Sequence, residues 1–267
     1  MADPFQDVDA AGPEFIAAFA DSMDVRQSDP TMEAIVADYL GRLRFSDQTL
    51  TIEIGAGAGA VTRRVAARAA PGRVIGFEPS SGFVEEARKR AGDHANLEFT
   101  VADGAALPLE AGSVDHAVMH TVLSHVTEPS TLLAEAHRVL KPGGTVVVCD
   151  ADFSKSAMGN FPDDPLDACA RTFVREFVTE AHMGAKARPL LQEAGFVVDA
   201  FNVTSRVVLD GKQMLPWVVE TCKLMVARGE IGQPLADALA AESARRAEAG
   251  TFYGYQAFVT AIARRSD

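Results

Sequence analysis

Three glycines at alternate positions mark the stretch of this chain that is most suited to ligand chemistry. Leu50–Ile54 is an apolar run typical of a strand, and Gly55, Gly57 and Gly59 follow it directly before a helix begins. Glycine has no Cβ, so it adopts positive φ at little cost and lets a ligand approach the backbone. The free N–H groups of the next helix point to the same place and favour negative or lone-pair-rich groups. The stretch predicts a nucleotide-like ligand.

The glycine loop alone leaves two ligand classes open. Gly55, Gly57 and Ala60 match the G-x-G-x-x-G/A pattern of dinucleotide-binding enzymes. Glu78 ends the next predicted strand, where such enzymes carry a ribose-binding acid. An NAD-dependent oxidoreductase is therefore one interpretation, although the chain has no Tyr-x-x-x-Lys pair to support it.

The surrounding residues favour a different cofactor. Glu53 lies two residues before the first glycine, and Asp103 follows the third predicted strand. The stretches that form the pattern are Glu53–Gly59, Val74–Ser80, Val101–Leu109, Ser113–Asp115, Leu123–Val126 and Arg138–Gly144. In this order and spacing the chain resembles the class I S-adenosylmethionine (SAM)-dependent methyltransferases, of the broad group that includes ubiquinone-biosynthesis-type and small-molecule enzymes. The resemblance covers roughly residues 45–150.

The resemblance implies a role for each acid of the predicted site. Gly55 would pass under the methionine part of SAM, and Glu53 would hold its ammonium group, directly or through water. Glu78 would accept both ribose hydroxyls, and Asp103 would accept the adenine amino group. Each acid also has a structural alternative: a partner for a buried arginine, a solvated strand end and a turn residue, respectively. The implied cofactor-binding set is Glu53, Gly55, Ala56, Gly57, Gly59, Glu78, Pro79, Ala102, Asp103, Gly104, His120 and Thr121.

Two polar residues follow the fourth predicted strand and should face the sulfonium of SAM. His120 is the candidate catalytic residue there, as a base for the substrate or a contact to the methionine part, with Thr121 beside it. The alternative for His120 is an imidazole hydrogen-bonded inside the pocket wall. His125 is expected to be a packing residue. Asp150 and Asp152 follow the fifth strand and are expected at the pocket rim.

Strands and helices alternate regularly from residue 50 to residue 150. This alternation predicts an α/β fold with a Rossmann-like doubly wound sheet, mostly parallel, with an antiparallel last strand and helical lid insertions. Residues 1–30 predict an irregular N-terminal arm or lid with one short helix, from which Arg26 could reach across the cofactor. Residues 31–267 predict the methyltransferase domain, with a first helix capped by Thr31 and cap segments at about 151–181 and 211–249.

Composition narrows the class of partner. The chain of 267 residues has 25 Lys and Arg against 37 Asp and Glu, a formal net charge of −12, which disfavours nucleic acid and anionic membranes. The acidic start has no signal-peptide pattern, and Cys149, Cys169 and Cys222 form no close pair. We therefore expect a cytoplasmic protein, a monomer or homodimer, that binds SAM and no metal ion.

The predicted reaction is methyl transfer from SAM to a small, partly apolar acceptor at oxygen, nitrogen or carbon. The donor is already activated, so the protein chiefly aligns the reactants. A member of this fold that binds SAM without methylating is the alternative from another class. The chain lacks the Asn/Asp-Pro-Pro-Tyr/Phe motif of many protein and nucleic-acid methyltransferases.

Overall fold

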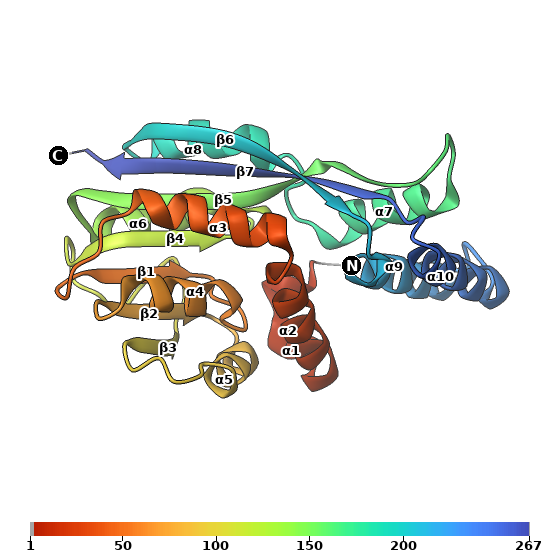
Figure 1. The fold of residues 1–267 in the computed structure, drawn as a ribbon, viewed down its shortest axis with the longest axis horizontal. Helices are drawn as coiled ribbons and strands as arrows, with labels where there is room; N and C mark the ends of the chain where they lie inside the picture. Colours follow the sequence, from red (N-terminus) through yellow and green to blue (C-terminus); the bar gives the residue numbers. More distant parts are fainter. Residues whose placement is uncertain (1–2, 267) are drawn as a thin grey trace.

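A computed structural model describes residues 3–266 and contains one seven-stranded sheet in the order β3-β2-β1-β4-β5-β7-β6 (Figure 1). The strands are β1 (Leu50–Ile54), β2 (Arg73–Glu78), β3 (Leu97–Val101), β4 (Val114–His120), β5 (Leu140–Met158), β6 (Phe196–Val208) and β7 (Gly254–Arg265). Strands β1 to β5 are parallel, and β7 runs antiparallel to both of its neighbours, β5 and β6. The predicted fold class is confirmed.

Helices cover both faces of this sheet. The helices are α1 (Val8–Ala11), α2 (Pro13–Gln27), α3 (Pro30–Arg42), α4 (Ala60–Ala69), α5 (Ser81–Lys89), α6 (Pro129–Val139), α7 (Pro165–Phe177), α8 (Met183–Glu193), α9 (Leu215–Ala227) and α10 (Gln233–Glu248). Val118 of β4 packs in the cluster that contains α3 and α4, whereas Met119 packs in the cluster that contains α6 and α8. Successive side chains of a strand point to opposite faces, so one apolar run supplies both cores.

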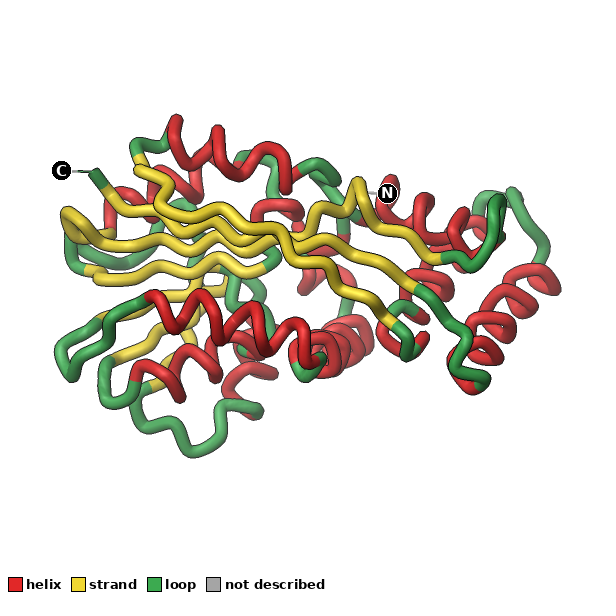
Figure 2. The backbone as a smooth tube through the Cα atoms, turned by 45° about the horizontal axis from the view of Figure 1, so that its top comes forward, coloured by secondary structure: helices red, strands yellow, loops and turns green. Residues whose placement is uncertain are grey.

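The fifth strand is much longer than its sequence predicts. Asp150 and Asp152 were expected to follow this strand, but β5 continues to Met158 and pairs with β7 along that extension. Figure 2 shows β5, β6 and β7 running beyond the ends of the parallel strands. Cap helices α7, α9 and α10 pack at that far end around Leu166, Val218 and Leu239. The extension therefore carries a second, smaller core.

The N-terminal arm is helical, so the prediction of an irregular arm with one short helix was wrong. Its helix α2 has 15 residues, begins at Pro13 and ends at Gln27. The cap of α3 also differs: Asp29 accepts from the N–H groups of Thr31 and Met32, so Asp29 and not Thr31 caps this helix. Proline at the first helical position is favourable because its missing N–H needs no partner there.

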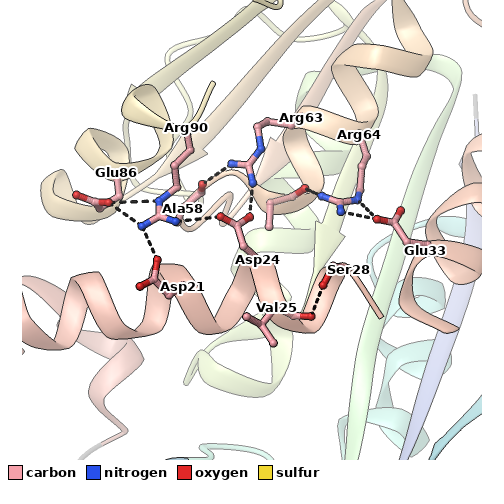
Figure 3. A network of polar contacts seen from close by, with 11 residues as sticks. Asp21, Asp24, Val25, Ser28, Glu33, Ala58, Arg63, Arg64, Glu86 and Arg90 are labelled. Carbon is pink, nitrogen blue, oxygen red and sulfur yellow. Dashed lines mark hydrogen bonds and ion pairs between the residues drawn. The ribbon is translucent and has the colours of Figure 1, made fainter. Parts of the chain in front are cut away.

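Ion pairs fasten the arm to the parallel half of the sheet (Figure 3). Asp24 of α2 pairs with Arg63 of α4 and with Arg90, which follows α5; Asp21 also pairs with Arg90 at 2.9 Å. Asp9 accepts from the backbone N–H groups of Ser81 and Gly82 at the start of α5. The arm thus lies over the carboxyl ends of β1 and β2. No helix within residues 3–266 is both long and apolar enough to span a membrane.

Candidate functional site

Two adjoining cavities open at the carboxyl ends of the parallel strands. The glycine-loop cavity is lined by Gly55, Gly57, Glu78, Asp103 and Thr121, among others. The arginine cavity is lined by Arg26, Phe153, Phe173, Arg206 and Trp217, among others. Both cavities share Phe5, Met23, Thr121 and His125 in their walls. A ligand in one cavity would therefore meet a ligand in the other at these residues.

Backbone hydrogen bonds fix the glycine loop against β2. The N–H groups of Gly55 and Ala56 both donate to the carbonyl of Phe77, at 2.8 and 3.0 Å. Gly55 has a φ of +75°, and a Cβ there would lie 2.7 Å from a methyl group of Val122. A side chain at this position meets both strain and a clash. A larger residue at position 55 would therefore strain the loop as well as fill space beside it.

Glu78 and Asp103 bring two carboxylates to one cavity. Glu78 is buried, and its oxygens accept from the N–H groups of Gly57 at 2.9 Å and Ser80 at 3.0 Å. Burial raises the pKa of Glu78. Asp103 is exposed, and one of its oxygens accepts from the N–H group of Ala105 at 2.9 Å. A carboxylate has about four lone-pair sites, so both acids keep acceptor capacity for a ligand.

Glu53 lies behind the loop and not in the cavity wall. It is 2% exposed and accepts from the hydroxyl of Thr62 at 2.6 Å. Burial raises its pKa to about 8. Ala56, Gly59 and Ala102 also lie outside the lining, whereas Pro79 and Gly104 belong to it. Part of the predicted cofactor-binding set therefore lines the cavity, and the rest lies outside its lining.

His120 and Thr121 are neighbours with different surroundings. His120 is buried, its Nδ1 lies 3.2 Å from the hydroxyl of Tyr39, and it lines neither cavity. Desolvation and the charges of Arg26 and Arg64 lower the pKa of His120 to about 3. Thr121 lines both cavities, and its φ of +59° is unusual for a β-branched residue. Its buried hydroxyl has no partner among residues 3–266.

His125 is the imidazole that the structure places between the two cavities. Its Nδ1 lies 2.8 Å from the Asp3 carboxylate, which also accepts from the N–H and hydroxyl of Thr179. Donation from Nδ1 to Asp3 leaves the lone pair of Nε2 available to a ligand. The sequence suggested a packing histidine. Its partner Asp3 is far away in the chain, so no local sequence pattern could predict their contact.

The remaining polar candidates have structural partners. Asp150 is buried and accepts from Ser124 and from the N–H of Ala151, while Asp152 accepts from the hydroxyl of Ser154 at 2.5 Å. Neither lines a cavity. Arg26 of the arm was expected to reach across the cofactor, but it lines the arginine cavity instead.

Comparisons with known proteins agree with this geometry. Residues 52–148 match the model of a methyltransferase domain. An uncharacterised protein of transposon Tn4556 from Streptomyces fradiae is 33% identical over 70% of this chain and 60% of its own length. A demethylmenaquinone methyltransferase from Clavibacter sepedonicus is 35% identical over 37% of this chain and 40% of its own length. The chain thus spans only about half the length of these relatives.

A solved structure extends the likeness to nearly the whole fold. The candidate methyltransferase BH2331 of Bacillus halodurans superposes with a TM-score of 0.63 at 16% identity, over 87% of this chain and 99% of its own. At this identity the likeness concerns the fold alone. Residues 52–148 therefore match a methyltransferase domain, and nearly the whole chain has the fold of this solved structure.

Proposed function

We propose that this protein transfers the methyl group of SAM to a small organic acceptor. The observation that carries the proposal is the meeting of two cavities at Thr121 and His125. One cavity has the glycine loop and two carboxylates, and the other has aromatic walls. A donor and an acceptor bound side by side would react across this junction.

The residues of the glycine-loop cavity fit SAM. The two carboxylates, Glu78 and Asp103, can accept from ribose hydroxyls and from the adenine amino group. The hydroxyl of Thr121, which has no hydrogen-bond partner among residues 3–266, offers a further polar contact near the methyl group of SAM. Glu53 lies farther back, so it would reach the ammonium group of SAM through water. When bound, SAM supplies a methyl group on a sulfonium that needs no further activation.

The protein contributes alignment and exclusion of water. Phe5 and Met23 of the arm wall both cavities, so the arm would close over the reacting centre. Holding two reactants in a productive geometry contributes roughly 7–11 kcal/mol to catalysis. We propose that residues 1–30 act as a lid and that the segments at 151–181 and 211–249 act as a cap over the acceptor.

We propose His125 as the group that takes a proton from the acceptor. Its Nε2 makes no hydrogen bond within residues 3–266, so it can accept from a ligand at the junction. Asp3 contacts Nδ1 and fixes the orientation of the ring, as the residue that orients a catalytic base does in other enzymes. His120, the residue that the sequence favoured, is neutral, buried and outside both cavities. Its role is better described as packing and as a partner for Tyr39.

The acceptor, the oligomeric state and the cellular location extend the proposal. We propose a small, partly apolar metabolite, a monomer or homodimer, and a cytoplasmic location, with neither nucleic acid nor membrane as a partner. The exclusion of nucleic acid and membrane rests on the acidic balance of the sequence, the partly apolar acceptor on the aromatic walls of the arginine cavity, and the location on the three unpaired cysteines.

Calorimetry with SAM, S-adenosylhomocysteine and NADH tests the cofactor. The expected result is micromolar or tighter binding of the first two and none of NADH; no binding of either sulfur ligand would refute the proposal. Mass spectrometry of co-purified molecules then identifies acceptor candidates. Turnover should yield S-adenosylhomocysteine and a methylated product, whereas substrate consumption with intact SAM would indicate a non-methylating reaction.

A further inference from the structure

The arginine cavity contains two guanidinium groups and no carboxylate among the described residues that line it. Arg206 of β6 is only 2% exposed. Arg26 lies near the end of α2, and its Nε is buried without a hydrogen-bond partner. Arginines enclosed in this way are normally paired, because an unpaired charge in an apolar setting is strongly unfavourable.

The protein supplies only part of the compensation. Arg206 donates to Gln256 Oε1 at 2.6 Å and reaches the Asp29 carboxylate at 3.5 Å. Arg26 has no side-chain hydrogen bond and no ion pair to any of residues 3–266. The charge of Asp150 favours the charged form of Arg26, but the Asp150 oxygens already accept hydrogen bonds from Ser124 and from the N–H of Ala151.

Two arginines face this cavity, and the acids nearest to them, Asp29 and Asp150, lie outside its lining. Burial, and next the charge of Arg206, lower the pKa of Arg26 to about 10, so Arg26 remains charged at neutral pH. Gln213 Oε1, which also belongs to this cavity, is buried and unpartnered. Two guanidinium groups in one cavity favour a ligand with a negative charge, whereas the oxygen of Gln213 would accept from a donor group of the same ligand.

Aromatic side chains form the rest of the wall. The rings of Phe173 and Trp217 are stacked, with centroids 4.6 Å apart and planes 6° from parallel, and Phe153 lies 6.0 Å from Trp217. Flat, apolar walls favour a planar, apolar ligand body.

The register of the sheet places Arg206 away from the junction. Phe258 of β7 pairs with Ala151 of β5, just beyond the carboxyl end of the parallel part of that strand. Gln256, two residues before Phe258 in β7, pairs with Arg206 of β6. Two residues of a strand span about 6–7 Å. An anionic group held by Arg206 would therefore lie about 6–7 Å along the sheet from Ala151.

We propose that the methyl acceptor is a planar, apolar monoanion whose carboxylate is bound by Arg26 and Arg206 in the arginine cavity. This inference rests on the proposed function and adds the substrate class. Guanidinium groups bind carboxylates through paired, charge-assisted hydrogen bonds, so they both anchor and orient such a ligand. The anchored end would set which atom of the acceptor reaches the methyl group.

Matched acid and amide pairs test the charge. We would titrate the full chain, saturated with S-adenosylhomocysteine, with benzoate, 2-naphthoate and anthracene-2-carboxylate, and with the neutral amide of each. At least one acid should bind about 10- to 100-fold more tightly than its amide, the range expected for hydrogen bonds to charged groups. Equal binding or no binding of all three acids would overturn the inference, as would a preference for 2-naphthyl phosphate over 2-naphthoate.

Substitution of the unpaired arginine separates binding from folding. Arg26→Met should abolish the preference for acids without lowering Tm, because the half-buried guanidinium makes no hydrogen bond or ion pair within residues 3–266 and methionine has a similar volume. Arg26→Lys should restore part of the preference. Arg245→Met, at an exposed arginine of α10, is the matched control and should change neither property. A fall in Tm for Arg26→Met with acid binding intact would mean a structural role.

The two proposals can fail separately. Binding of S-adenosylhomocysteine without any preference for acids would refute only the substrate class. Absence of S-adenosylhomocysteine binding to the wild-type chain would refute the proposed function, whereas the acid titrations can still be repeated without it.

Discussion

The two cavities of this protein carry opposite charge, although they share part of one wall. Among their described lining residues, the glycine-loop cavity has Glu78 and Asp103 and no arginine or lysine, whereas the arginine cavity has Arg26 and Arg206 and no acid. SAM carries a sulfonium and an ammonium group, which suit the first cavity. Each ligand would therefore be attracted to its own place and repelled from the other.

The cavities also differ in how their charges are held. Backbone N–H groups of Gly57 and Ser80 hold the Glu78 carboxylate in place, so the position of this acid is fixed before a ligand binds. Arg26 has no such partner among residues 3–266. The cofactor half is preorganised by the chain itself, and the acceptor half is completed by its ligand.

The largest expected effect concerns a buried arginine that does have its partner. Arg246 of α10 pairs with Asp164 at 2.5 Å, and both are buried outside the two cavities. Arg246→Met should reduce the free energy of unfolding by about 3–5 kcal/mol, because it leaves a carboxylate alone in the interior. Urea titration measures this, and a stabilised Arg246→Met variant would remove the contrast with Arg26→Met.

The same pair has a defined pH dependence. Burial alone would raise the pKa of Asp164, but hydrogen bonds from Arg246 and from the N–H groups of Asn160 and Leu166 lower it overall. A lowered carboxyl pKa contributes stability above the ordinary value near 3.8, and this contribution is lost as the pH falls through the folded-state pKa. Arg246→Met should weaken this acid-induced loss.

The second prediction concerns the junction. His125→Gln should lower kcat by about 10²-fold, equivalent to about 2.7 kcal/mol, because no side chain then takes the proton from the substrate that receives the methyl group. The dissociation constant for S-adenosylhomocysteine should change little. Single-turnover kinetics with an identified acceptor would measure the effect, with His94→Gln, at a position outside both cavities, as the control. Full activity of His125→Gln would make this imidazole a wall residue.

The third prediction tests the acidic cavity. Glu78→Gln should weaken S-adenosylhomocysteine binding by about 10- to 100-fold, since it removes a charge-assisted acceptor and turns an amide N–H toward backbone donors. Asp103→Asn, at an exposed position, should weaken it by a smaller factor. Calorimetry compares both with Glu98→Gln, an exposed acid outside the cavity. Equal affinities throughout would show that the ribose and adenine lie elsewhere.

The smallest expected signal is a proton released on cofactor binding. Burial raises the pKa of Glu53 from 4.5 to about 8, so the free protein holds a proton there at pH 7. The ammonium group of SAM, reached through water, would favour the charged form and expel about one proton. Calorimetry in buffers of different ionisation enthalpy would measure this release, and Glu53→Gln should abolish it.

The sign of the Glu53 effect on folding can be tested in the same variant. A carboxyl pKa raised in the folded state means that stability falls as the pH rises from about 4.5 to about 8. Glu53→Gln should flatten that decline in the free protein. A Glu53 that only holds Thr62 would show the decline but no proton release with cofactor.

The sequence by itself determined the parallel half of this fold. The bounds of β1, β2, β3 and α4 follow from short apolar runs, glycines and helix-period patterns, all of which are local. Gly55, Gly57, Glu78 and Asp103 were predicted as one site for the same reason: each lies at or just after a strand end, and the ends of parallel strands meet at one edge of a sheet.

Only the tertiary structure decided the acceptor half. The extension of β5, the contact of Asp3 with His125 and the approach of Arg26 to Arg206 join segments that are far apart in the sequence. The sequence favoured His120, at the end of β4, as the base and made His125 a packing residue. Burial beside Tyr39 excludes the first from both cavities, and the arm brings Asp3 to the second, because packing and not spacing sets which side chain meets a ligand.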